Sequence, residues 1–224
     1  MEKPRKSTGR EVVETAVAGA AGSIPVVGSV LAAGLTFALT MAHNRRMDAW
    51  FDSIAERIDA LEDRPSWEEL AADDAFVDVV IEASRVAAGS AQEEKLAALR
   101  NAVVNTIRGV EPDEDLRSTF LRYVDEMTPT HLALLEFMSG PGRFCDSRGF
   151  ERPNIYMGSV HSVLEAALPS VASSPLLETA ESDLDSRRLI HSGLKVMMTG
   201  PAVFETRTKP LGDRFLRFIT DGDA

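Results

Sequence analysis

The sequence predicts a mainly helical protein, and three observations support this fold class. Ala, Leu and Val supply most of the apolar residues, whereas aromatic residues amount to only 6%, a composition that favours helices over sheets. Apolar residues recur at the three- and four-residue spacing of one helix face. With 224 residues, the chain is long enough for one large domain or two small ones.

The clearest predicted helix covers residues 44–64, "NRRMDAWFDSIAERIDALEDR". Its apolar residues share one helix face, opposite the acidic residues; they are Met47, Trp50, Phe51, Ile54, Ile58 and Leu61. Pro65 is expected to end this helix. Ser66 and Glu69 have the spacing of a capping box, which predicts the start of a short second helix.

Four further helices are predicted in the middle of the chain, over residues 73–90, 91–109, 112–127 and 128–140. Gly89 and Gly109 stop the first two of these helices. The third begins with an acidic turn, which suits the positive end of a helix dipole. Thr128 is the expected N-cap of the fourth, followed by Pro129 at the first helical position.

The last third of the chain changes character. Residues 140–153 are expected to form a loop, followed by helices over 154–168 and 175–197. "AVFETRT", residues 202–208, has the composition of a short strand. Pro210 and Gly212 are expected to bracket a turn before a closing helix that ends at Ile219.

The most unusual feature is an apolar run near the start of the chain. No charged residue occurs from Thr15 to Met41, and Pro25 and Gly28 divide this run into two arms. Neither arm alone spans a hydrocarbon layer of about 30 Å comfortably, and cations lie on both sides of the run. The pattern fits a shallow hairpin or a segment lying against anionic lipid. It equally fits a helical hairpin buried in the core or in a homo-oligomer, and both interpretations stay open.

The membrane interpretation assigns roles to two sets of residues. The side chains that would enter the apolar layer, or an interface between copies, are Ile24, Val26, Val27, Leu31, Leu35, Phe37 and Leu39. The cations that would hold lipid headgroups are Lys3, Arg5, Lys6, Arg45 and Arg46.

No catalytic, metal-binding or cofactor-binding pattern is found in the sequence. The four histidines have no metal-ligand spacing, and no phosphate loop or dinucleotide fingerprint occurs. Cys145 is the single cysteine, with no evident histidine and acid to activate it. The sequence therefore predicts no enzyme, no metal and no cofactor. The net charge of −11 also argues against broad binding to nucleic acid.

The order of segments in the C-terminal part resembles a winged-helix domain. "TPTHLALLEFM", a helix near 155–168 and "SRRLIHSGLKVM" are followed by "FETRTKPLGDRFLRFI". The resemblance implies a short β-wing ahead of the closing helix. It would place nucleic-acid contacts at Arg187, Arg188, Arg207 and Lys209. Residues 128–224 nevertheless hold ten Lys and Arg against twelve Asp and Glu, which gives a net charge of −2 that opposes phosphate binding.

The combination of "EEKLAALRNAVVNTI", "FLRYVDEMTPTHLALLEFM" and "KPLGDRFLRFI" also resembles the Abi-alpha-like abortive-infection proteins of bacteria, over roughly residues 45–219. That resemblance implies a role in phage defence and carries no catalytic residues.

These observations predict three parts: a basic tail with the apolar segment (1–43), a helical domain (44–127) and a winged-helix-like domain (128–224). The expected function is that of a non-enzymatic phage-defence or interaction protein in the bacterial cytoplasm. Its apolar segment would associate with the inner membrane, peripherally or integrally, or with copies of itself. A winged-helix DNA-binding regulator is the alternative, and a soluble scaffold that buries the apolar run is a third interpretation.

Overall fold

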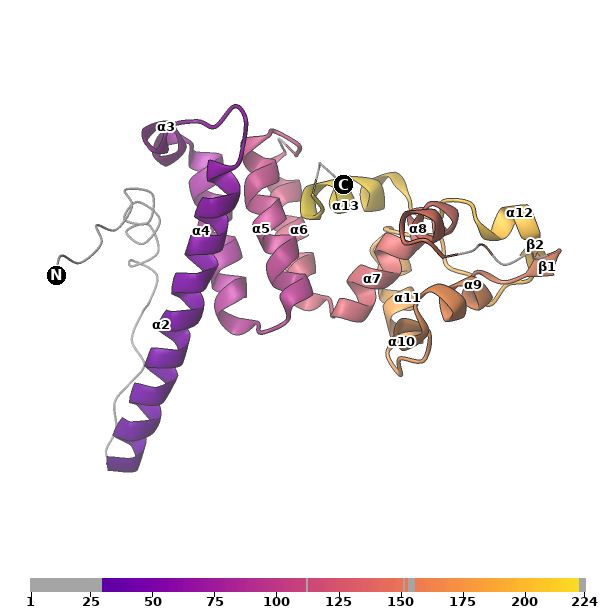
Figure 1. Ribbon diagram of the computed structural model, residues 1–224, viewed down its shortest axis with the longest axis horizontal. Helices are drawn as coiled ribbons and strands as arrows, with labels where there is room; N and C mark the ends of the chain where they lie inside the picture. The colour runs from indigo at the N-terminus through magenta and orange to yellow at the C-terminus, as the bar shows by residue number, and fades with distance from the viewer. Residues whose placement is uncertain (1–29, 112, 151, 153–155, 222–224) are drawn as a thin grey trace. The chain divides into compact units, whose positions relative to one another are not determined.

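A computed structural model describes residues 30–111, 113–150, 152 and 156–221, with the backbone alone for residues 30–34 (Figure 1). The fold is mainly helical, as predicted, and its described residues contain one small two-stranded sheet. The chain forms two compact units. The first unit contains the residues up to Asp125 and those from Ile219 onward, and the second contains Glu126–Phe218.

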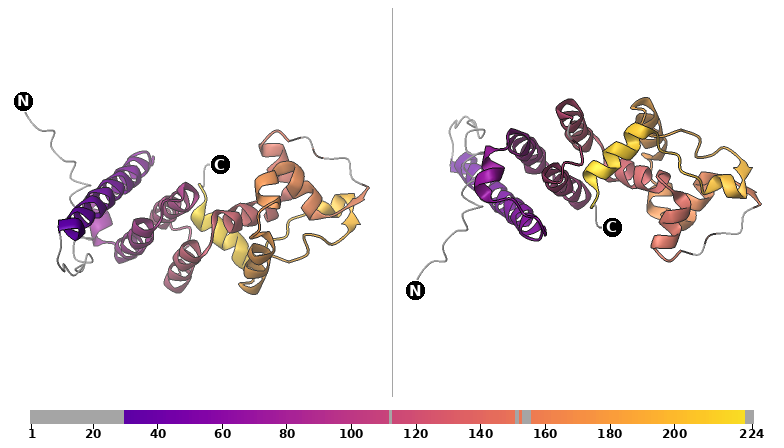
Figure 2. Two further views of the ribbon diagram at one scale, coloured as in Figure 1. Left: turned by 90° about the horizontal axis from the view of Figure 1, so that it is seen from below. Right: turned by 90° about the horizontal axis from the view of Figure 1, so that it is seen from above.

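The first unit is built from helices that pack side by side. They are α2 (Val30–Asp59), α3 (Trp67–Ala72), α4 (Asp74–Gly89), α5 (Glu93–Ile107) and α6 (Glu114–Glu126). Helix α4 runs back along α2, and α5 returns beside α4 (Figure 1, Figure 2). Helix α2 buries one face in this bundle, with Trp50, Phe51, Ile54 and Ile58.

Helix α2 differs from its predicted bounds at both ends. It begins at Val30 rather than near residue 44, because the preceding residues include many good helix formers such as Ala and Leu. It ends at Asp59 rather than at Pro65, and the Leu61 N–H bonds to the Ile58 carbonyl in a turn. The helical face predicted for this segment is buried from Trp50 to Ile58.

The predicted capping box at the start of α3 is confirmed. The Ser66 N–H donates to Glu69 Oε2 at 2.8 Å, and the Glu69 N–H donates to Ser66 Oγ at 3.2 Å. These hydrogen bonds favour the ionised carboxylate and lower the pKa of Glu69. The cap thus fixes the first turn of a helix that has only six residues.

The end of the chain completes the first unit. The side-chain amide of Asn101 donates to the Ile219 carbonyl at 3.0 Å, and that of Asn105 donates to the Thr220 carbonyl at 2.8 Å. Arg57 of α2 forms an ion pair with Asp221 at 2.6 Å. Residues that are more than 100 positions apart in the sequence are therefore tied together within one bundle.

The second unit contains short helices and the small sheet. Its elements are α7 (Pro129–Met138), α8 (Pro141–Ser147), β1 (Met157–Gly158), α9 (Val160–Ala167), α10 (Pro169–Ala172), α11 (Leu177–Ser186), β2 (Met198–Thr199), α12 (Gly200–Val203) and α13 (Pro210–Ile219). Strands β1 and β2 are antiparallel, with Met157 opposite Thr199. An isolated bridge also joins Ile190 to Thr208.

The predictions for residues 140–168 were wrong in part. Residues 141–147 form helix α8 instead of a loop, because Pro141 occupies the first helical position and Phe144 and Cys145 are buried. The next helix, α9, begins only at Val160, where the side chain of Ser159 caps it. Strand β1 occupies part of the segment that was expected to be helical.

Helix α11 ends eleven residues before the predicted end at 197. Arg188 adopts the left-handed conformation, with φ of 60°. The Leu189 N–H bonds to the Leu184 carbonyl and the Arg188 N–H bonds to the Asp185 carbonyl, which together make a Schellman motif. Glycine usually occupies this left-handed position, so the arginine gave no stop signal in the sequence.

The strand expected over 202–208 is absent from its predicted place. Gly200–Val203 forms helix α12, and of the predicted strand only Thr208 pairs, in the isolated bridge. The closing helix is confirmed as α13, but Pro210 and Gly212 lie inside its first turn rather than around a turn before it. A Cβ atom at Gly212 would lie 2.1 Å from the Leu189 carbonyl oxygen, so this close approach requires glycine.

Candidate functional site

Helix α2 has two halves with opposite environments. We call residues 30–49 the projecting half and residues 50–59 the packed half. Among the α2 residues whose side chains are described, Trp50 is the first that is buried, and none is buried from residue 35 to residue 49. Figure 1 shows the projecting half extending past the turn between α4 and α5. This half holds the predicted apolar contact residues that the structure describes.

Large apolar side chains are exposed over a broad arc of the projecting half. Leu35 is 61% exposed, Phe37 68%, Leu39 57% and Met41 56%. A helix turns by about 100° per residue, so Phe37 lies about 200° around the axis from Leu35, whereas Leu39 lies about 40° from it. These four side chains share one apolar arc about 200° wide, and Thr36, Thr40, His43 and Asn44 occupy the remaining sector. The projecting half is therefore amphipathic, and its apolar arc is broader than one narrow contact stripe.

Charge changes sharply where the projecting half meets the bundle. From Val30 to Asn44 the helix has no Asp, Glu, Lys or Arg, and Arg45 and Arg46 then follow, both exposed. The first carboxylate is that of Asp48. The uncharged part rises about 22 Å, at about 1.5 Å per residue. Two cations therefore separate the uncharged part from the first acidic side chain.

None of the described helices is both long enough and apolar enough to cross a bilayer.

The structure places part of the predicted lipid-contact set on this half of α2. Leu35, Phe37, Leu39, Arg45 and Arg46 lie there and are exposed. Leu31 lies in α2, at a position where only the backbone is described. The remaining predicted residues lie outside the described part of the chain; they are Lys3, Arg5, Lys6, Ile24, Val26 and Val27. Met41 was missed in the prediction, although it belongs to the same uncharged segment.

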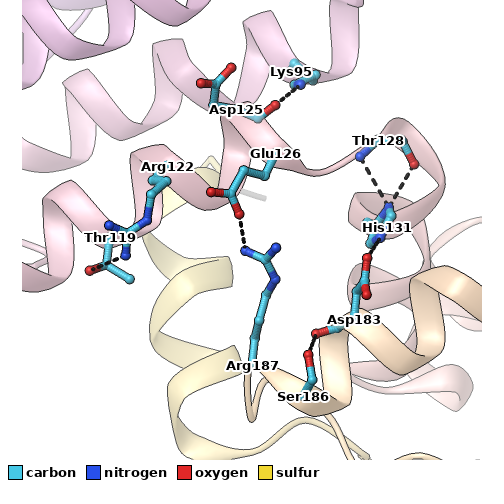
Figure 3. Close-up of polar contacts among 10 residues, drawn as sticks. All are labelled: Lys95, Thr119, Arg122, Asp125, Glu126, Thr128, His131, Asp183, Ser186 and Arg187. Carbon is cyan, nitrogen blue, oxygen red and sulfur yellow. Dashed lines mark hydrogen bonds and ion pairs between the residues drawn. The ribbon is translucent and has the colours of Figure 1, made fainter.

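The cations of the DNA-binding alternative are mostly engaged in contacts within the second unit. Arg187 pairs with Glu126 at 2.7 Å (Figure 3). Lys209 pairs with Asp185 at 2.7 Å, and its hydrogen bond lowers the pKa of that carboxyl. Arg207 donates to the Ala202 carbonyl at 3.1 Å. Arg188 is exposed, but it occupies the left-handed cap position of α11. The carboxylate partners reduce the positive potential that a phosphate backbone would require.

A threonine, a histidine and an aspartate meet at the start of α7, a grouping that the sequence analysis missed (Figure 3). Thr128 Oγ1 lies 2.8 Å from His131 Nδ1, and His131 Nε2 lies 3.3 Å from Asp183 Oδ2. The backbone N–H of Thr128 also donates to Nδ1, at 3.2 Å. Nδ1 therefore acts as an acceptor, and the buried imidazole caps the helix as the glutamate of a capping box does. This geometry assigns the group a structural role.

Cys145 is buried beside Phe144 in α8. Burial raises the pKa of its thiol, which is the opposite of the shift that a nucleophilic thiolate needs.

The chain was compared with protein-family models, with the sequences of curated proteins and with solved structures, and none of these comparisons finds a match.

Proposed function

We propose that this protein is an interaction protein that docks on an anionic lipid surface through the projecting half of α2. One observation carries the proposal: Leu35, Phe37, Leu39 and Met41 are all more than half exposed and lie in one broad apolar arc of the helix. Each such side chain gains about 1.5–3 kcal/mol when it leaves water completely. The projecting half therefore favours an apolar surrounding over water.

Lipid suits this arrangement better than a second copy of the chain does. A single partner helix covers one stripe of its neighbour, which would leave part of the apolar arc, about 200° wide, in water. A helix lying in the interface of a bilayer would place the whole arc against acyl chains and its polar sector toward the headgroups. Arg45 and Arg46 follow the uncharged segment directly, where they would meet lipid headgroups, and each contributes about 1 kcal/mol near an anionic surface.

The experiment compares vesicle binding of the wild-type chain with that of a triple variant, Leu35→Ser, Phe37→Ser and Leu39→Ser. A matched control replaces three exposed apolar residues of the second unit, Tyr156→Ser, Val196→Ser and Met197→Ser. The wild type and the control should float with vesicles that contain phosphatidylglycerol, whereas the α2 variant should stay in the soluble fraction.

Two results would overturn the lipid proposal. One is a wild-type chain that stays soluble beside vesicles. The other is a wild-type homo-oligomer that forms without lipid, that the α2 variant dissociates, and that shows no vesicle binding; this result would assign the same surface to self-association.

The resemblance to the abortive-infection proteins supports a role in bacterial phage defence, with the second unit receiving the signal and α2 delivering the response at the inner membrane. The proposal includes no enzymatic step. Expression of the wild-type chain should reduce the efficiency of phage plating on a bacterial host, and the triple α2 variant should lose this protection. Equal plating on both strains would contradict the defence role without touching the lipid proposal.

We further propose that the second unit is a winged-helix-like domain that contacts protein rather than DNA. The bridge from Ile190 to Thr208 joins the ends of a segment placed like a wing, after α11. Helix α11 carries Glu178, Glu181, Asp183 and Asp185, which would repel phosphates at the position of a recognition helix. Salt-sensitive duplex binding that falls on Arg188→Gln would favour the DNA-binding alternative instead.

A further inference from the structure

A polar pocket opens at the turn between α4 and α5 in the first unit. Its volume is about 470 Å³, and its polar lining comes from Arg85, Ser90, Gln92, Lys95 and Asp125. Arg85 and Lys95 outnumber the single carboxylate of Asp125, although the whole chain has a net charge of −11. The pocket is therefore a local site of positive charge on an acidic protein, and such a site favours an anionic ligand.

Lys95 is a buried cation whose hydrogen-bonding capacity is only partly used. The residue is 8% exposed, and its Nζ donates to the main-chain carbonyl of Asp125 at 2.6 Å (Figure 3). An ammonium group has three N–H donors, so two remain for a ligand. Among the described residues, no carboxylate lies within ion-pair distance of Lys95. Burial lowers its pKa, and the charge of the nearby Asp125 carboxylate offsets only part of that effect.

The rest of the lining adds donors of the same kind. Arg85 is exposed at the rim, and its charge also interacts with that of Glu82, three residues earlier on α4. Helix α5 begins at the pocket with no side chain capping its first turn, so the positive end of its dipole faces the same space. The first-turn carboxylate of Glu93 is engaged by Arg100 at 2.7 Å. A phosphate group would find two cationic side chains there.

The pocket lies at the end of the bundle from which the projecting half of α2 leaves. The indole N–H of Trp50 donates to Ser84 Oγ at 3.2 Å, which fixes the register of α2 against the antiparallel α4. Arg45 lies five residues before Trp50 on α2, and Gly89 lies five residues after Ser84 on α4. Because the helices are antiparallel and both rise about 1.5 Å per residue, Arg45 and Gly89 lie at the same level. Arg45 and Arg46 thus lie level with the end of α4 that lines the pocket, where Gly89 and Ser90 are.

We propose that this pocket binds a phosphate group, and that the phosphate belongs to an anionic lipid headgroup when the projecting half of α2 is inserted. The second part of the proposal rests on the proposed function. Lys95 holds one phosphate oxygen through its two remaining donors, and Arg85 binds the group from the rim. Soluble phosphate has the same chemistry, so the experiment separates the two sources.

The first arm titrates inorganic phosphate and glycerol 3-phosphate into the full chain and follows the backbone amide resonances of residues 89–92. The variants are Arg85→Gln and Lys95→Met, and the matched control is Arg122→Gln on the exposed surface of α6. The wild type and the control should show saturable shifts, and each pocket variant should bind about tenfold more weakly. Arg85 is exposed, so Arg85→Gln keeps the test valid even where Lys95→Met changes stability.

The second arm measures flotation with phosphatidylcholine vesicles that contain or lack phosphatidylglycerol. Both pocket variants should still bind through α2, but they should lose part of the preference for the anionic vesicles. Phosphate shifts without any change in vesicle preference would overturn the lipid source and assign the pocket to a soluble phosphate. Pocket variants that match the wild type in both arms would overturn the site itself. Absence of vesicle binding by every protein, with the phosphate shifts intact, would instead mark a failure of the proposed function.

Discussion

The two halves of α2 have similar apolar side chains and opposite environments. Phe37 in the projecting half is 68% exposed, whereas Phe51 in the packed half is 6% exposed. The same contrast separates Leu39, at 57%, from Ile54, at 1%. The packed half has α4 and α5 beside it, and the projecting half extends beyond both. Burial along this helix is therefore decided by the length of its neighbours, not by its own composition.

The sequence pattern follows this difference. In the packed half, acidic residues alternate with Trp50, Ile54 and Ile58, which leaves one polar face for water and one apolar face for the bundle. The projecting half has no charged residue before Arg45, and its polar sector holds Thr36, Thr40, His43 and Asn44 in place of carboxylates. The amphipathic pattern persists there, with a broader apolar arc and an uncharged polar face.

The largest test of the comparison removes equal amounts of apolar side chain from the two halves. Ile58→Ala should lower the free energy of unfolding by about 2–5 kcal/mol, because this fully buried side chain leaves a cavity. Leu39→Ala should change it by no more than about 0.5 kcal/mol, because its side chain is exposed. Urea unfolding followed by tryptophan fluorescence reports on the first unit alone, since Trp50 and Trp67 both belong to it. Equal losses in the two variants would show that the projecting half is packed in solution.

A second test probes the residue where the halves meet. Trp50→Phe removes the indole N–H that bonds to the buried Ser84 hydroxyl at 3.2 Å. The hydroxyl loses its donor, so the free energy of unfolding should fall by about 1–3 kcal/mol. Adding Ser84→Ala should recover part of this loss, as measured by urea unfolding with circular dichroism. No recovery in the double variant would assign the loss to packing alone.

The smallest expected effect comes from the titration of Glu82 in α4, the helix against which α2 packs. Burial raises the pKa of Glu82 above its ordinary value of 4.5, so the folded chain disfavours the ionised carboxylate. The stability that Glu82 contributes is thus present below pH 4.5 and is lost as the pH rises through the raised pKa. Glu82→Gln should give a small increase in melting temperature at pH 7 and none at pH 4. An equal increase at both values would rule out the titration of Glu82 as its cause.

Short sequence motifs were sufficient to predict features that depend only on neighbouring residues, such as helix caps. Ser66 and Glu69 predicted the cap of α3, and Thr128 with Pro129 predicted the start of α7. The end of α11 could not be predicted, because Arg188 occupies a position that glycine usually marks. The pairing of β1 with β2 joins residues about 40 positions apart, and it depends on contacts that no local pattern encodes.

The candidate site divides in the same way. The uncharged run and the arginines after it are visible in the sequence, and so are Leu35, Phe37 and Leu39 as contact residues. Their exposure depends on where α4 and α5 end, which is a tertiary property. The pocket at Lys95 was not anticipated, because Asp125 lies 30 residues away from that lysine and on another helix.

The return of the chain end to the first unit has a consequence for synthesis. The amides of Asn101 and Asn105 leave the ribosome well before their acceptors at Ile219 and Thr220 have been made. At about 5–20 residues per second, translation of the intervening segment imposes a wait of about 6–24 s. During that wait the contacts to Ile219 and Thr220 are missing from the nascent bundle. The exposed apolar side chains of the projecting half are already made and can contact other molecules.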